Sequence, residues 1–292
     1  MMINDPKISK MKITHKLTYH LLNIFSKWLQ KKSFSSRIRF SRRMGSFVYY
    51  FLPIRKKLAA LNIKKAFPEK NKSFYKKTLK DLYYVSCRNF VDLMALPASK
   101  SDTKFDIEGK HYLDDSLKEK KGVILVTGHF GLWELWGSWL GLNRYKIWGI
   151  IQRQKNLGAD LFFKQKRESY GINHIYRRSS LDVSYDALNN GEILILASDQ
   201  NAKQKGVKVN FFNHSSSTPK GAAIFHLRTK APIIFSVLEI SNEDKVRITF
   251  KKIKTTKESS IASITQDYTS KLEDFVRKNP SHYFWFHNKW KE

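Results

Sequence analysis

His129 and Glu134 are the residues whose types and spacing best suit proton-transfer chemistry. They lie in the segment GHFGLWE, where His129 follows an apolar, β-branched run and Glu134 falls about one turn into the next predicted helix. An imidazole can act as a general base while a nearby carboxylate fixes its tautomer and stabilises the imidazolium that forms. Such a pair suits acyl transfer from a thioester to a hydroxyl, and we expect the two side chains to be hydrogen-bonded.

Spacing alone is a weak signal, because His287 and Glu292 repeat it at the end of the chain. Short motifs carry this risk in any sequence of this length. The local sequence adds support, since Gly128 and Gly131 flank a tight turn that leaves the histidine unhindered and lets a substrate approach the backbone. We therefore include Gly131 among the predicted substrate-binding residues.

Three further polar residues follow predicted strands. Arg153 comes after the strand at 147–152, and Asp199 and Gln200 come after the strand at 193–198. Ligands of open α/β sheets bind beyond the carboxyl ends of the strands. We predict that these residues converge with the histidine and bind substrate, although a mutual salt bridge or helix capping is the structural alternative for Arg153 and Asp199.

Other catalytic chemistries have less support in the sequence. Cys87 is the only cysteine, which excludes an intramolecular disulfide and a multi-cysteine zinc site. There is no G-x-S-x-G elbow, no Gly-rich phosphate loop and no paired metal-ligand spacing among the remaining histidines. We predict no metal and no resident cofactor.

Short apolar runs alternate with longer amphipathic segments along most of the chain. The predicted strands are residues 122–127, 147–152, 193–198, 232–239 and 245–253. The predicted helices are residues 71–96, 110–120, 132–140, 157–170, 181–190, 219–229 and 261–277. Strands separated by helices of this length favour an α/β domain with a mostly parallel central sheet flanked by helices.

The chain carries a formal net charge of +29, and the excess is concentrated toward the N-terminus. Residues 1–80 contain 21 Lys and Arg residues against Asp5 and Glu69. This balance predicts an anionic partner, either nucleic acid, anionic lipid or an acidic carrier protein. We predict two domains: a basic, helical membrane-associating region over 1–100 and an α/β domain over 101–292.

The N-terminal region contains a candidate amphipathic helix. Its apolar residues recur at helical spacing beside several lysines, and they are Leu17, Leu21, Ile24, Phe25, Trp28 and Leu29. This pattern is typical of a helix that lies in a membrane interface, and a surface helix packed on the core is the alternative. No apolar run is long enough to predict a membrane span.

Five blocks of the sequence resemble the lipid A biosynthesis lauroyl/myristoyl acyltransferases, whose wider relatives are the lysophospholipid acyltransferases. The blocks read GHFGLWE, IIQRQKN, ASDQNAKQKGVKVNFF, STPKGAA and NPSHYFWFHNKWK. They occur in the order of the family, and the region that they span, from about Gly122 to the C-terminus, is more than half of the chain. Asn213 and His214 depart from the family pattern where a glycine is usual, and Asn288 departs where an arginine is usual.

The resemblance implies an enzyme that transfers a fatty acyl chain from acyl carrier protein to a hydroxyl of a lipid A precursor. His129 would be the general base and Glu134 its partner, with Arg153 and Asp199 in the active-site region. Acyl carrier protein and an anionic membrane lipid would be the partners, and the cytoplasmic face of the inner membrane the location, with peripheral or monotopic attachment.

Three alternatives remain open. The same chemistry can act on another acceptor, such as a phosphatidylinositol mannoside, another glycolipid or an amino-acid lipid. A nucleic-acid-binding protein is disfavoured, because the aromatic residues fall within apolar strands and helices and no nucleic-acid motif is present. A catalytically inactive scaffold is disfavoured by the presence of both His129 and Glu134.

Overall fold

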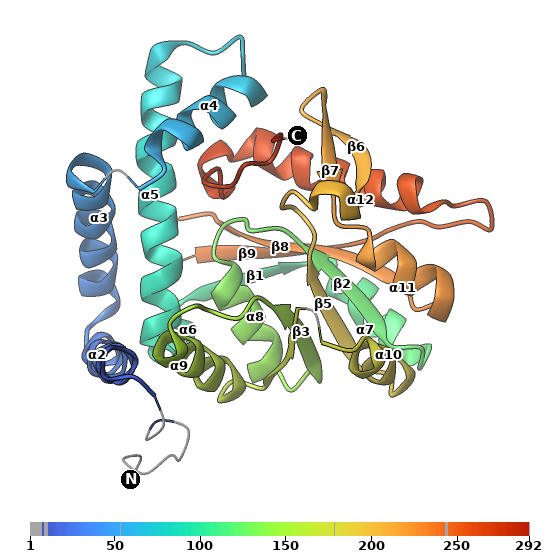
Figure 1. Cartoon of the computed structure of the whole chain (residues 1–292), viewed down its shortest axis with the longest axis horizontal. Coiled ribbons are helices and arrows are strands. Elements are labelled where there is room, and N and C mark those ends of the chain that lie inside the picture. Colours follow the sequence, from blue (N-terminus) through green and yellow to red (C-terminus); the bar gives the residue numbers. More distant parts are fainter. Residues whose placement is uncertain (1–7, 9–10, 53, 178, 243–244, 292) are drawn as a thin grey trace.

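The structure is a computed structural model, shown in Figure 1, and it describes residues 8, 11–52, 54–177, 179–242 and 245–291. Glu292, the carboxylate of the second His-x4-Glu pair, lies outside these residues. The architecture within them is a central sheet with helices on both faces (Figure 1). The predicted α/β fold class is therefore confirmed.

The central sheet contains seven strands within the described residues, in the order β1-β9-β8-β2-β5-β3-β4. Their bounds are β1 Lys104–Glu108, β2 Val123–Thr127, β3 Ile147–Ile151, β4 Ile172–Tyr176, β5 Ile193–Ala197, β8 Ile233–Ile240 and β9 Lys245–Lys252. Strands β8, β2, β5, β3 and β4 run parallel, whereas β9 is antiparallel to β8 and parallel to β1. The five predicted strands are all present.

The helices occupy the predicted segments and three unpredicted ones, of which one has only five residues. Their bounds are α2 Ile13–Gln30, α3 Phe34–Phe51, α4 Lys56–Ala66, α5 Lys72–Ala95, α6 Ala98–Asp102, α7 Lys110–Lys118, α8 Trp133–Leu142, α9 Leu157–Glu168, α10 Asp182–Asn189, α11 Gly221–Thr229 and α12 Ile261–Lys278. Short 3-10 turns are η1 Lys203–Lys205 and η2 Pro280–His282. The unpredicted α3 and α4 lie in the basic N-terminal region, which is helical as expected.

Alternate residues of β2 face two separate cores. Ile124 and Val126 pack with α11, α12 and residues 279–291, which we call the closing segment. Val123 and Leu125 pack with α7 and α8. This alternation is what a strand buried on both faces requires. Helix α5 stands beside the sheet in Figure 1 and contributes side chains to both cores. The division at residue 100 stays a prediction.

Helix α2 lies on the outer side of α5 (Figure 1). Tyr19 and Leu29 of α2 are buried in a third core with residues of α5 and α9. The buried hydroxyl of Ser26 donates to the Met94 carbonyl at 2.7 Å, which ties α2 to the end of α5. The amphipathic helix is therefore confirmed, and one of its faces packs on the protein.

A two-residue turn explains one departure from the family pattern. Strands β6 Val207–Phe211 and β7 His214–Thr218 form a hairpin that is joined by Phe212 and Asn213. Both turn residues have positive φ, 53° and 59°. Asparagine tolerates this left-handed conformation better than most residues do, so it can stand where relatives have glycine.

The loop that carries His129, between β2 and α8, is held from two sides. Gly131 forms a bridge with Leu238 of β8, and its N–H donates to the His282 carbonyl at 2.9 Å. The Phe284 N–H donates to the His129 carbonyl at 3.0 Å. Gly131 has φ 59°, and a Cβ there would lie 1.8 Å from the Leu238 carbonyl oxygen. A glycine is required here by the approach of β8.

We predict that Gly131→Ala lowers the free energy of unfolding by about 2–5 kcal/mol, because a left-handed alanine costs about 1–2 kcal/mol and an overpacked contact about 1–3 kcal/mol. Urea unfolding of the purified chain measures this change. Gly221→Ala is the matched control, since a Cβ at Gly221 meets no heavy atom within 4 Å. Equal stability of the two variants would contradict the prediction.

Candidate active site

His129 and Asp199 form the central pair of the site. They follow β2 and β5, which are neighbours in the sheet with Thr127 opposite Ala197. The His129 Nδ1 atom lies 2.8 Å from Asp199 Oδ1. The histidine side chain is 28% exposed and the aspartate side chain 2% exposed. The buried carboxylate therefore holds an imidazole whose other side reaches solvent.

The charges of this pair support each other. Burial acts to lower the His129 pKa, but the Asp199 and Glu134 carboxylates outweigh this effect, so the pKa lies above its ordinary value. Burial acts to raise the Asp199 pKa, but His129 and the Lys289 charge hold it below its ordinary value. An ionised Asp199 accepts a hydrogen bond from the Nδ1–H group of a neutral imidazole, which leaves the Nε2 lone pair available as a base.

The predicted hydrogen bond between His129 and Glu134 is wrong. Arg167 of α9 donates to both carboxylate oxygens of Glu134, from Nε at 2.9 Å and from Nη2 at 2.6 Å. Burial raises the Glu134 pKa, but the Arg167 charge outweighs this effect and the pKa is lowered. A bidentate guanidinium pairs better with a buried carboxylate than a neutral imidazole does, which explains the preference.

The backbone of Glu134 is fixed by a residue of another helix. The Leu132 N-cap of α8 makes no side-chain capping bond. The Asn89 Oδ1 atom of α5, a buried residue, instead accepts from the Glu134 N–H at 3.1 Å. The start of α8 is therefore capped across the helix interface, and its position depends on α5.

The other predicted substrate-binding residues lie at the same sheet edge in different settings. The Arg153 side chain is 68% exposed, with Nε 3.8 Å from Asp160 Oδ2 and the guanidinium over the Tyr176 ring. Arg153 is not paired with Asp199, so the mutual salt bridge between these two residues is wrong. Gln200 follows Asp199 and is partly buried, and Gly131 contacts β8. The binding roles of these residues stay predictions.

The closing segment supplies several neighbours of the pair that were not predicted individually. The Phe284 ring centroid lies 6.0 Å from that of His129, and the Tyr283 hydroxyl donates to the Asp199 carbonyl at 3.4 Å. Lys289 is 2% exposed and donates to Thr218 Oγ1 at 3.1 Å. Burial lowers the Lys289 pKa to about 8. The sequence block NPSHYFWFHNKWK, which resembles the family, contains these neighbours and was the signal that this segment contributes to the site.

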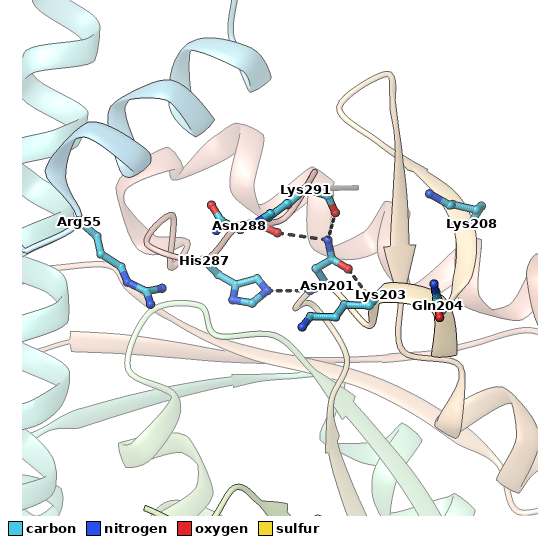
Figure 2. A pocket seen from close by; sticks show the side chains of 8 residues that line it. All are labelled: Arg55, Asn201, Lys203, Gln204, Lys208, His287, Asn288 and Lys291. Atoms are coloured by element: carbon cyan, nitrogen blue, oxygen red, sulfur yellow. Dashed lines mark hydrogen bonds between the residues drawn. The ribbon is translucent and has the colours of Figure 1, made fainter. Parts of the chain in front are cut away.

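Next to the pair lies a cavity of about 810 Å³ (Figure 2). Its lining residues are Arg55, Asn201, Lys203, Gln204, Lys208, His287, Asn288 and Lys291. The Asn201 N–H donates to His287 Nε2 at 2.9 Å. Burial lowers the His287 pKa. Asn201, which lies two positions after Asp199 in the chain, connects the cavity wall to the pair.

Comparison with known proteins assigns the family. Residues 6–292 match the sequence profile of the bacterial lipid A biosynthesis acyltransferases. The chain belongs to this family. The resemblance found in the sequence blocks is confirmed, and the match extends through the N-terminal helices as well as the α/β part.

Relatives of this family member occur in mycobacteria. The chain is 26% identical over 132 residues to a phosphatidylinositol mannoside acyltransferase of two strains of Mycobacterium tuberculosis, covering 44% of this chain and 42% of the relative. It is 24% identical over 145 residues to the protein of the same name from Mycolicibacterium smegmatis, covering 48% of each. The matched segments therefore span less than half of these relatives.

The hydrogen-bond geometry predicts which carboxylate has the larger effect on the pKa of His129. We expect Asp199→Asn to lower the His129 pKa more than Glu134→Gln does, because Asp199 makes the direct hydrogen bond and removing either negative charge favours the neutral ring. NMR titration of histidine-labelled protein measures this pKa, with His129→Gln to assign the resonance. Exposed Asp186 provides the control Asp186→Asn. A larger decrease in Glu134→Gln would contradict the pairing.

Proposed function

We propose that this protein is an acyltransferase that moves a fatty acyl group from a thioester to a hydroxyl of a lipid. The observation that carries the proposal is the bond between His129 and buried Asp199 beside a solvent-accessible imidazole face. His129 Nε2 takes the proton as the hydroxyl oxygen attacks the thioester carbonyl carbon. The carbon–sulfur bond then breaks, and the imidazolium returns the proton to the thiolate.

Asp199 and Glu134 have different roles in this proposal. Asp199 fixes the tautomer of His129 and stabilises the imidazolium through a direct bond. Glu134 adds negative charge near the ring while its carboxylate is held by Arg167. We propose that Glu134, predicted as a catalytic residue, is a positioning residue that stabilises the His129 imidazolium through space. Arg153, Gln200 and Gly131 remain candidates for substrate binding at the same edge.

Acyl carrier protein is the proposed donor and a lipid A precursor the proposed acceptor. The family assignment supports a lipid A type of acceptor, and the net charge of +29 suits both an acidic carrier and a phosphorylated lipid. The names of the mycobacterial relatives support the alternative, the same chemistry on a phosphatidylinositol mannoside or another glycolipid. No resident cofactor or metal enters the proposed reaction.

Acyl transfer from a carrier-protein thioester to a panel of lipid acceptors tests this function. We expect transfer to a lipid A precursor, and we expect His129→Ala to lower kcat by about 10²–10⁴-fold, because general-base catalysis contributes that much. His111→Ala, a change at an exposed histidine, is the matched control. Transfer only to another glycolipid would reassign the acceptor. Absence of transfer to every acceptor, or full activity of His129→Ala, would overturn the proposal.

We propose that the protein attaches peripherally to the cytoplasmic face of the inner membrane through α2. One face of this helix is apolar and exposed, and it consists of Ile13, Leu17, Leu21, Ile24 and Trp28. Lysines flank this face, as in helices that lie in the headgroup region of anionic bilayers. Among the described helices, none combines the length and apolar character needed to cross a bilayer.

Co-sedimentation with phosphatidylglycerol-containing vesicles tests the attachment. We expect the triple variant Leu17→Ser/Leu21→Ser/Ile24→Ser to bind at least about tenfold more weakly, because each apolar side chain that enters a bilayer contributes up to about 1.5–3 kcal/mol. The double variant Leu181→Ser/Val183→Ser, at exposed apolar residues beside and in α10, is the control. Unchanged binding of the triple variant would contradict attachment through α2.

A further inference from the structure

The cavity beside His287 is formed by three segments that are distant in the sequence. Arg55 precedes α4 directly, and residues 287–291 come from the end of the chain. Asn201, Lys203 and Gln204 come from the segment between β5 and β6, and Lys208 comes from β6 itself. Figure 2 shows Arg55 reaching toward His287 from one side, with Lys203 and Lys208 on the other. The volume of about 810 Å³ suits a ligand larger than a single phosphate ion.

The lining is strongly basic. Four of its eight residues are cationic, namely Arg55, Lys203, Lys208 and Lys291, and none of the eight is acidic. The ion pairs of the described residues involve other cations, such as Lys110 with Asp114 and Lys271 with Asp267. In the part of the chain that the structure describes, the positive charge of this cavity therefore has no paired carboxylate. An anionic ligand can supply the missing counter-charge.

Two of the cationic residues have a left-handed backbone conformation. Arg55 has φ 52° and Lys203 has φ 54°, which side chains with a Cβ rarely adopt. Arg55 Nη1 donates to the Phe286 carbonyl at 2.9 Å. The Lys203 N–H donates to Asn201 Oδ1 at 2.6 Å, and its carbonyl accepts from the Ser217 hydroxyl. These contacts hold the guanidinium group of Arg55 and the backbone of Lys203 in place.

Asn201 joins the walls of the cavity to each other and to the active site. Its Nδ2 atom donates to the Lys291 carbonyl at 2.6 Å and to the Asn288 carbonyl at 3.3 Å. Its backbone N–H donates to His287 Nε2. Asn201 lies two positions after Asp199, and His287 lies three positions after Phe284, whose ring centroid is 6.0 Å from that of His129. A ligand anchored in the cavity therefore lies next to the catalytic pair.

We propose that this basic cavity binds the phosphate ester of a substrate and thereby positions the reacting group at His129. The four cations bind the phosphate, and the exposed amides of Gln204 and Asn288 are available to bond hydroxyl or amide groups beside it. This inference rests on the proposed acyl transfer. That reaction offers two sources of a phosphate ester, the phosphopantetheine arm of the donor and a phosphorylated headgroup of the acceptor.

Calorimetric binding to the full-length chain tests the inference without relying on activity. The probes are 4′-phosphopantetheine for the donor and glucosamine 1-phosphate for the acceptor, each compared with its dephosphorylated form. We expect one phosphorylated probe to bind more tightly than its counterpart. We expect Lys203→Gln/Lys208→Gln to raise its Kd at least about tenfold, because two charge-assisted contacts are lost.

Lys205→Gln/Lys254→Gln is the matched control, because it removes two exposed lysines outside the cavity and changes the net charge equally. We expect its Kd to equal that of the wild-type chain. Loss of phosphopantetheine binding in the cavity variant assigns the cavity to the donor, and loss of glucosamine 1-phosphate binding assigns it to the acceptor.

Equal binding of phosphorylated and dephosphorylated probes, or equal Kd values for the cavity variant and the control, would overturn the inference even if acyl transfer is observed. Phosphate-dependent binding that is lost in the cavity variant, together with no transfer to any acceptor, would support the cavity and overturn the proposed function. The two failures are therefore distinguishable.

Discussion

The site depends on the pairing of β2 with β5. These strands are buried, apolar and in register, so the residues that follow them leave the sheet side by side. His129 and Asp199 are separated by 70 positions in the chain, and this ladder brings them to 2.8 Å. A shift of one residue in the pairing of β5 with β2 would turn every side chain of β5 to the opposite face of the sheet. Packing of these side chains in the two cores prevents such a shift. The core thus sets the register that the chemistry needs.

A buried and a partly buried carboxylate lie near one imidazole, and their surroundings separate their roles. Asp199 bonds the ring directly, and its pKa is lowered by His129 and Lys289 although burial acts to raise it. Glu134 is neutralised by Arg167 and influences His129 only through space. Both carboxylates stay ionised, because each has a cationic or hydrogen-bonding partner that outweighs its burial.

The closing segment connects the catalytic pair with the basic cavity. Phe284 holds the His129 loop through its N–H, Lys289 lies close enough to lower the Asp199 pKa, and His287 forms a wall of the cavity. This segment packs against the β2–α8 loop and the β6–β7 hairpin, so its position depends on both. In the functions proposed above, one short stretch of backbone would connect substrate binding with proton transfer.

The sequence by itself determined the five apolar strands, most helices and the convergence of His129 and Asp199 at one sheet edge, because apolar runs and the turns that end them are local signals. Short strands such as β4, with its polar residues Asn173 and His174, lacked that signal. Only the tertiary structure decided that Asp199, rather than Glu134, bonds the histidine. Glu134 does not bond the histidine because Arg167 of α9 binds its carboxylate. The cavity likewise forms only because three segments that are distant in the sequence meet. Contacts between elements far apart in the chain have no local pattern to reveal them.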